Sequence, residues 1–217
     1  MVSANIRKIL EEIPPHVKLV AVSKTKPVEL IMEAYETGQR AFGENKVQEM
    51  SGKYDQLPKD IEWHLIGHLQ SNKVKYIAPF VHLIHAVDSL KLLEVINKEG
   101  EKNNRVINCL LQFHIAQEET KFGLDLDEAK ALLNSDSFKS MKNVSIQGVM
   151  GMASFTEDEA QIRKEFRLLK SAFEELQFLI RNSQFSILSF GMSGDYKIAI
   201  EEGSNMIRVG SSIFGGR

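Results

Sequence analysis

The alternation of strand-like and helix-like segments constrains the fold more than any other feature of this chain. Short apolar runs, each typical of a buried strand, recur eight times and are separated by segments of helical periodicity. Their starts lie near Val17, Arg40, Ile61, Val81, Arg105, Val144, Phe185 and Met206. Strands that alternate with helices predict a parallel sheet, because each parallel connection needs a crossover long enough to hold a helix.

The helix predictions rest on start signals, stop signals and apolar spacing. Pro27 is expected at the first position of a helix that includes Tyr35 and is stopped by Gly38, and Ser89 is expected to cap another. A long amphipathic run covers residues 158–180. Further helices are expected over 3–12, 127–133 and 195–202.

A parallel sheet of eight strands can close into a barrel or stay open. An open, doubly wound sheet is expected to carry a Gly-x-Gly-x-x-Gly turn after its first strand, and this chain has Ser-Lys-Thr-Lys-Pro at 23–27 instead. Eight strands favour a (β/α)8 TIM barrel, for which 217 residues are sufficient. We therefore predict a single α/β barrel domain over 1–217, with a leading N-terminal helix.

Charge and composition argue against several classes of protein. A formal net charge of -2 gives no electrostatic case for binding nucleic acid or a membrane surface. No apolar run could span a bilayer, and the N-terminus lacks the apolar core of a signal peptide, so a cytoplasmic protein is expected. The single cysteine, Cys109, excludes an internal disulfide and is expected to be a buried, inert thiol. Since no exposed heptad repeat occurs, we expect a monomer.

Lys24 is the first candidate functional residue, because it closes the apolar run 17–24. A lysine in that position is expected to lose hydration of its amine, and burial favours the neutral amine, which condenses with aldehydes. The alternative is a lysine that reaches along the strand end to solvent. In a barrel, Lys24 would lie at the C-terminal end of the first strand, the end that carries active sites.

Two short turns near the other end of the chain are rich in glycine and serine. They are Gly-Met-Ser-Gly-Asp at 191–195 and Gly-Ser-Ser at 210–212, after the last two predicted strands. Glycine lets the backbone approach a phosphate, and serine donates hydrogen bonds to it. The alternative for Ser193 is that it only caps its helix. A Schiff-base lysine with a phosphate site indicates pyridoxal 5'-phosphate (PLP). The expected contacts are Met192, Ser193, Gly210 and Ser211.

Three further side chains are predicted to contact such a cofactor. Barrel closure makes the first and last strands neighbours, so Arg208 points into the barrel mouth and can donate a hydrogen bond to a pyridine nitrogen. Because arginine keeps its proton, that nitrogen would stay unprotonated and the ring would be a weaker electron sink. Asn45, at the end of the second strand, either bonds the ring oxygen or caps a helix. His64, in the third strand, either packs beneath the ring or is a buried, hydrogen-bonded histidine.

A metal centre is the competing interpretation, and the histidine spacing argues against it. His82 and His85 are three residues apart in a predicted strand and so face opposite sides of the sheet. His64 and His68 are separated by a strand end and Gly67. No Cys/His or His-Glu-x-x-His spacing occurs, and we predict no metal site.

Five stretches of the chain carry a resemblance to a known family. They are VAVSKT at 20–25, FGENKVQE at 42–49, WHLIGHLQSNK at 63–73, GMSGD at 191–195 and IRVGSSIFG at 207–215. They closely resemble the YggS/PROSC family of PLP-binding, or PLP homeostasis, proteins. The resemblance implies a barrel like the N-terminal domain of alanine racemase (fold type III), with a Schiff base on Lys24, phosphate on the two turns and Arg208 at the pyridine nitrogen. In one departure, Phe113 and His114 stand where the family often has asparagine.

The same resemblance implies a PLP carrier without clear catalytic turnover, which balances vitamin B6 pools and could supply client enzymes. Alanine racemase takes its second acid/base, a tyrosine, from a further domain, and the four tyrosines of this chain all read as helix residues: Tyr35, Tyr54, Tyr76 and Tyr196. One alternative is an amino-acid racemase with His64, His114 or a water as second base. Another is a barrel enzyme that forms Schiff bases directly with a sugar phosphate, as aldolases do.

Overall fold

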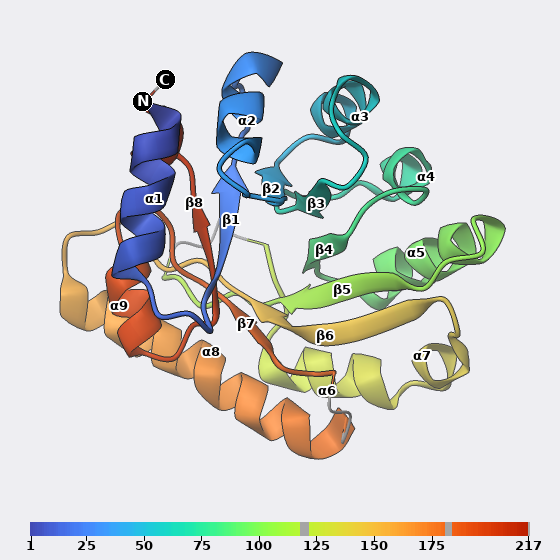
Figure 1. Ribbon diagram of the computed structural model, residues 1–217. Coiled ribbons are helices and arrows are strands. Elements are labelled where there is room, and N and C mark those ends of the chain that lie inside the picture. Colours follow the sequence, from blue (N-terminus) through green and yellow to red (C-terminus); the bar gives the residue numbers. More distant parts are fainter. Residues whose placement is uncertain (118–121, 181–183, 217) are drawn as a thin grey trace.

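The computed structural model describes residues 1–117, 122–180 and 184–216, and its central feature is a closed barrel of parallel strands (Figure 1). The order of strands around the barrel follows their order in the chain. The strands are β1 Lys18–Val22, β2 Ala41–Glu44, β3 Glu62–Leu65, β4 Leu83–Val87, β5 Ile107–Gln112, β6 Val144–Met150, β7 Ile187–Ser189 and β8 Met206–Val209. Each begins at, or within about two residues of, its predicted start.

The pairing of the first strand with the last decides between the two predicted closures. β1 runs parallel to β8, with Lys18 opposite Met206 and Val20 opposite Arg208. An open sheet would leave both strands as edges with unpaired backbone groups. The barrel prediction is therefore confirmed, and the open sheet is excluded.

The helices cover the outside of the barrel. They are α1 Val2–Glu12, α2 Val28–Tyr35, α3 Val47–Gln56, η1 Ser71–Lys73, α4 Val74–Ile77, α5 Leu90–Lys102, α6 Leu126–Asn134, α7 Asp136–Ser140, α8 Glu159–Ile180, α9 Tyr196–Glu201 and α10 Ser211–Phe214. Each segment predicted as a helix is one in the structure, whereas the helices over 47–56, 74–77, 136–140 and 211–214 were not predicted as segments. Ser89 caps α5 as predicted, since its side chain accepts the backbone N–H of Leu92. Pro27 is the N-cap of α2, so its predicted place as the first helical residue was wrong.

Apolar side chains pack in two layers on the two sides of the sheet. Leu19 and Ala21 belong to the large cluster between strands and helices, whereas Val20 points into the barrel, as the strand alternation predicts. The interior cluster consists of Val20, Ala41, Leu83, Ala86, Leu110, Met150 and Met206. Because the interior is filled, open space for a ligand is found at the mouth of the barrel and not along its axis.

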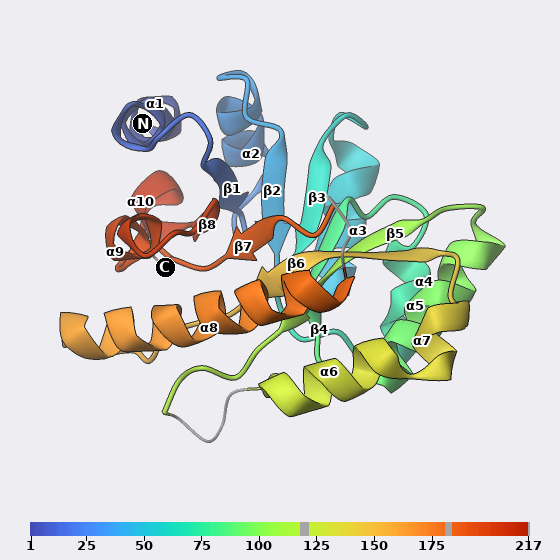
Figure 2. The ribbon, with the colours of Figure 1, turned by 90° about the horizontal axis from the view of Figure 1, so that it is seen from below.

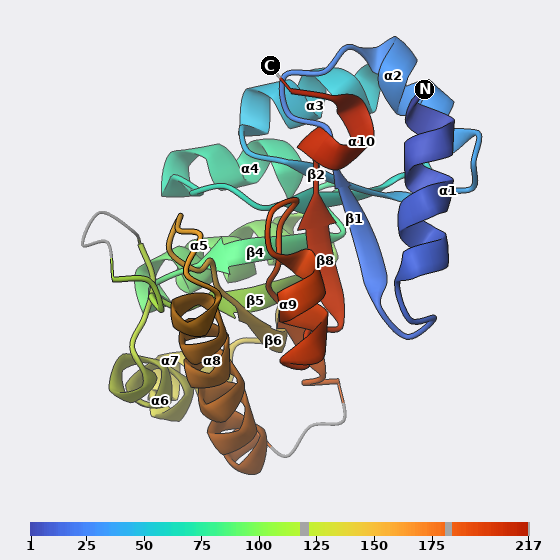
Figure 3. The ribbon, with the colours of Figure 1, turned by 90° about the vertical axis from the view of Figure 1, so that its left-hand side faces the viewer.

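The leading helix α1 packs on the outside of the barrel, on the side where the two chain termini lie (Figure 1). It lies beside α2 and α10, and the Asn5 side-chain amide donates to the Ile213 carbonyl of α10 (2.9 Å) (Figure 3). Seen from below, the long helix α8 runs along β6 (Figure 2). Within the described residues, every helix is too short or too polar to cross a membrane.

Candidate functional site

A cavity of about 730 Å³ opens at the C-terminal ends of the strands, and we call it the mouth cavity. Its size suits a small-molecule ligand. Loops that follow several different strands contribute to its wall, which is the usual construction of a TIM-barrel site. Of the residues predicted to contact a cofactor, those in its lining are Lys24, Asn45, Met192, Ser193, Arg208, Gly210 and Ser211.

Lys24 lies in a turn just beyond β1 and not on the strand itself. Its side chain is half-buried and lines the mouth cavity. Among the described residues, nothing accepts a hydrogen bond from its amine or forms an ion pair with it. The expectation of a fully desolvated amine was therefore wrong, because the cavity itself exposes this side chain. The amine is instead accessible to a ligand that enters the cavity.

A buried ion-pair network on the outer side of the sheet supports the turn that contains Lys24. The Ser23 hydroxyl donates to Glu44 Oε1 (2.6 Å), and Lys53 Nζ donates to the Ser23 carbonyl (2.8 Å) and to Glu44 Oε1 (2.7 Å). Glu44 has no exposed surface, and its burial raises the pKa of the carboxyl despite the hydrogen bonds from Lys53 and Ser23. Sequence reasoning missed this network, because Lys53 lies in a helix far from Ser23 in the chain.

The same network fixes the residue after Lys24. Thr25 adopts a left-handed backbone conformation with φ 63, which is unusual for a β-branched residue. Its backbone N–H donates to Glu49 Oε1 (2.6 Å), and Glu49 in turn pairs with Lys53 (2.7 Å). The backbone on both sides of Lys24 is therefore anchored, while the side chain of Lys24 has no partner within the part of the chain that the structure describes.

Arg208 points into the barrel from β8 and is almost completely buried, with 3% of its surface exposed. Nη1 donates to the Ser189 carbonyl (2.8 Å) and hydroxyl (2.7 Å), and Nη2 donates to the Gly151 carbonyl (3.0 Å). Burial lowers the pKa of Arg208 to about 10, so the guanidinium remains a cation at neutral pH. The predicted orientation of Arg208 toward the barrel mouth is confirmed, because it lines the mouth cavity together with Lys24.

The two glycine-serine turns meet at the cavity wall through one hydrogen bond. The Gly210 backbone N–H donates to Ser193 Oγ (3.1 Å), and Asp195, not Ser193, is the N-cap of α9. The alternative that Ser193 merely caps its helix was therefore wrong. Gly191 has φ +98, and a Cβ there would lie 2.5 Å from the Cβ of Ala199, so only glycine fits.

Asn45 follows β2 directly and lines the mouth cavity. The N-cap of α3 is Lys46, so the interpretation of Asn45 as a helix cap was wrong. The loop after β3 packs tightly against it, since a Cβ on Gly67 would lie 2.5 Å from the Asn45 carbonyl oxygen. Asn45 is thus held at the wall with its side-chain amide available for a ligand.

His64 is the one predicted contact that the structure places away from the cavity. It is fully buried inside the barrel, and its Nδ1 lies 2.8 Å from His85 Nε2. His85 Nδ1 lies 3.1 Å from the Ser189 hydroxyl, which also accepts from Arg208. Burial lowers the pKa of both histidines well below the usual range. Of the two interpretations of His64, the buried, hydrogen-bonded histidine is the one that the structure supports.

Several residues of the cavity wall were not singled out from the sequence. Gln112 ends β5, and the others come from loops after β3, β5 and β6, where no turn motif marks them: Ile66, His68, Phe122, Met152 and Ser154. The loop after β6 is held by Glu165, which accepts from the Ser154 backbone N–H (2.6 Å) and hydroxyl (2.8 Å). His114 is exposed and does not contribute to the wall.

Fold and site together define a barrel of the alanine racemase N-terminal type. The model of that family, "Alanine racemase, N-terminal domain", matches residues 1–217. Among solved structures, the alanine racemase of Bartonella henselae with covalently bound pyridoxal phosphate has a TM-score of 0.75 and covers 99% of this chain and 58% of its own. At 16% identity, that likeness concerns the fold alone.

Closer relatives identify the family. The pyridoxal phosphate homeostasis protein of Aquifex aeolicus is 41% identical over 201 residues, which cover 92% of this chain and 87% of the relative. PipY of Synechococcus elongatus, solved with PLP bound, is 34% identical, has a TM-score of 0.91 and covers 99% of this chain and 100% of its own. The chain therefore belongs to the pyridoxal phosphate homeostasis protein family, as the resemblance implied.

Proposed function

We propose that this protein binds PLP reversibly as a Schiff base on Lys24 and takes part in PLP homeostasis. The observation that carries the proposal is the meeting of Lys24, Arg208 and the two glycine-serine turns around one cavity. The amine, the buried cation and the hydrogen-bond donors of the two turns fit the aldehyde, the ring nitrogen and the phosphate of PLP, in that order. PipY, solved with PLP bound, supports the assignment.

Different residues of the wall would hold different parts of the cofactor. Ser193, Gly210 and Ser211, with Met192 beside them, would hold the phosphate. Arg208 would donate to the pyridine nitrogen, and Asn45 to the ring oxygen. PLP supplies an electron sink for amino-acid chemistry when its ring nitrogen is protonated. Arg208 would act against that, because its guanidinium donates a hydrogen bond to the lone pair of the ring nitrogen and cannot accept one from a protonated ring nitrogen.

The proposed protein is a carrier without clear turnover. A two-base racemase needs acid/base groups on both faces of the bound ring. The candidates for the second base, His64 and His114, both lie outside the wall of the mouth cavity, and so do all four tyrosines. His68 is the histidine in the wall, and its ring is stacked on Phe122 near Asp88. As a single-domain monomer of the cytoplasm, the carrier would supply PLP to client enzymes.

Absorbance spectra with added PLP test the cofactor assignment. We expect a Schiff-base band that borohydride reduces onto Lys24, located by peptide mass mapping. Lys24→Ala should lose the band. The matched control is Lys26→Ala, a second lysine of the same wall whose Nζ already donates to the carbonyls of Gly215 and Gly216, and it should keep the band. A label spread over surface lysines, or an adduct with the mass of a sugar phosphate, would overturn the assignment.

Hydrogen exchange separates the carrier from the racemase. PLP-loaded protein is incubated with amino acids in D2O, and deuterium at the α-carbon is measured by NMR. A carrier gives no exchange above that of free PLP. Exchange that depends on Lys24 would favour the amino-acid racemase instead.

A further inference from the structure

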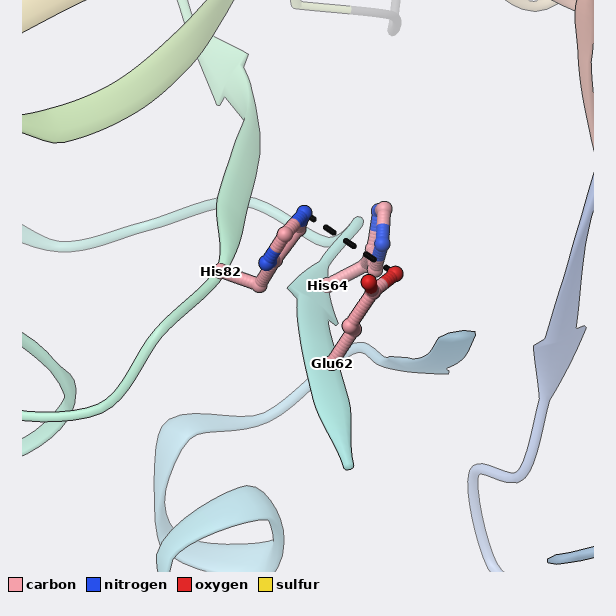
Figure 4. A group of neighbouring side chains, drawn as sticks. All are labelled: Glu62, His64 and His82. Carbon is pink, nitrogen blue, oxygen red and sulfur yellow. Dashed lines mark ion pairs between the residues drawn. The ribbon is translucent and has the colours of Figure 1, made fainter. Parts of the chain in front are cut away.

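The opposite end of the barrel, its base, holds a second cluster of polar side chains. Glu62 begins β3, His64 lies two residues further along the same strand, and His82 precedes β4. The three side chains point toward one another, and one ligand atom from each lies within 4.8 Å of the other two (Figure 4). Spacing along single strands could not predict this cluster, because neighbouring strands bring it together.

His64 carries the strongest sign that this cluster is built for a ligand. Its side chain is fully buried, and its Nδ1 is hydrogen-bonded with His85 Nε2. Its Nε2 is buried without a hydrogen-bond partner among the described residues. A buried polar atom without a partner is costly, so a group that completes it is expected.

The donor set matches one class of metal ion. Two imidazole nitrogens and one carboxylate oxygen are the three protein ligands of known four-coordinate sites for zinc, in which a water completes the set. Ligation through His64 Nε2 would put the proton on Nδ1, from which it is donated to His85 Nε2. A hydrogen bond from the second ring nitrogen orients a metal-bound histidine, and here His85 would accept it. The side chains of His82 and Glu62 are 41% and 35% exposed, so an ion can enter from solvent and keep a water as its fourth ligand.

Lys18 is the competitor for this site. Its Nζ lies 2.5 Å from Glu62 Oε2, whereas Glu62 Oε1 has no hydrogen-bond partner in the described part of the chain. An incoming cation would share the carboxylate with the ammonium or displace it. Lys18 therefore sets the affinity, and its removal should strengthen metal binding.

We propose that the base of the barrel is a binding site for a divalent first-row transition metal ion of the zinc type, held by Glu62, His64 and His82. The site is separate from the mouth cavity and does not depend on PLP.

The test is a titration of metal-depleted, PLP-free protein with Co2+ and Zn2+. Wild type should bind one ion per chain, with the absorption bands of four-coordinate Co2+ and displacement by Zn2+ in calorimetry. His82→Ala should weaken binding by roughly 100-fold or more, since it removes a direct ligand. Lys18→Met should strengthen binding several-fold. The matched control is His16→Ala, an exposed histidine outside the cluster, which should bind as wild type does.

Three results would overturn the proposal. They are no binding to the wild type, equal losses in His82→Ala and His16→Ala, and weaker binding in Lys18→Met. Because His82 and Lys18 are partly exposed, their variants are expected to fold, and circular dichroism confirms this before titration.

Discussion

Lys24 and Arg208 face the same cavity, and the protein holds them in opposite ways. Lys24 is half-buried, and its amine has no partner among residues 1–117, 122–180 and 184–216. Only its backbone is fixed, by the network of Lys53, Glu44 and Glu49 on the outer side of the sheet. Arg208 is buried, and its guanidinium itself is fixed by three hydrogen bonds inside the barrel. One cation is presented for reaction, and the other is locked in place.

The difference follows from what each side chain has to do. An amine that forms and releases a Schiff base needs room and no competing partner, so the protein secures the turn and leaves the side chain unbonded. A guanidinium that only faces a ring needs a constant position, which a rigid set of carbonyl acceptors provides. The two supports can be broken separately by single substitutions.

The largest effect on the free energy of unfolding is expected when the network that supports the Lys24 turn is broken. Lys53→Met leaves Glu44 buried without its cation, which should lower the free energy of unfolding by about 3–5 kcal/mol in denaturant titration. The matched control is Lys130→Met, because Lys130 pairs with Glu175 at the same 2.7 Å but on the exposed surface. That control should cost less than about 1 kcal/mol. Equal losses in both variants would contradict the role of burial.

Removal of one hydrogen-bond partner of Arg208 should lower the free energy of unfolding by less. Ser189→Ala removes the hydroxyl shared by Arg208 and His85 inside the barrel, which should cost about 1–3 kcal/mol of unfolding free energy. Borohydride should still label Lys24, but PLP should bind more weakly, because the guanidinium is less fixed. Ser186→Ala, at an exposed position just before β7, is the control and should change neither quantity. Loss of the Lys24 label in Ser189→Ala would show that the two supports are not independent.

The pH dependence of stability tests the carboxyl at the centre of the Lys24 support. Burial raises the pKa of Glu44 in the folded protein above the ordinary 4.5, so its contribution favours folding at low pH and is lost as the pH rises through the folded pKa. Glu44→Gln removes this titration. The stability of wild type relative to the variant should fall as the pH rises from 4.5 to the folded pKa, by at most about 1.4 kcal/mol per pH unit. A constant or rising difference would contradict the raised pKa.

The smallest effect concerns the strained backbone beside Lys24. Asparagine tolerates the left-handed region better than threonine, so Thr25→Asn should stabilise the protein by about 0.5–1 kcal/mol in denaturant titration. Asn104, which is exposed and has φ 51, offers the reverse exchange. Asn104→Thr should destabilise by a similar amount. If both variants lose stability, the conformation of Thr25 carries no strain.

Local patterns predicted the fold and most of the site. The starts of the strands, the cap at Ser89 and the two glycine-serine turns depend on neighbours in the chain, and all are found where they were expected. Closure of the barrel predicted that Lys24 and Arg208 meet at its mouth, and this is also confirmed, although Lys24 lies in the turn beyond β1 and not on the strand face. The position of His64 could not be decided in this way, because a strand residue that points inward can lie at any depth along the barrel.

The sequence by itself determined the eightfold alternation, the barrel and the residue types at its mouth, because hydrophobic periodicity and turn chemistry act over a few neighbouring residues. Only the tertiary structure decided which side chains support the residues at the mouth. Lys53 meets Ser23 across 30 positions of the chain, and His85 meets Ser189 across 104. Such partners are selected by burial, since a polar group removed from water must find whatever partner the fold brings within reach.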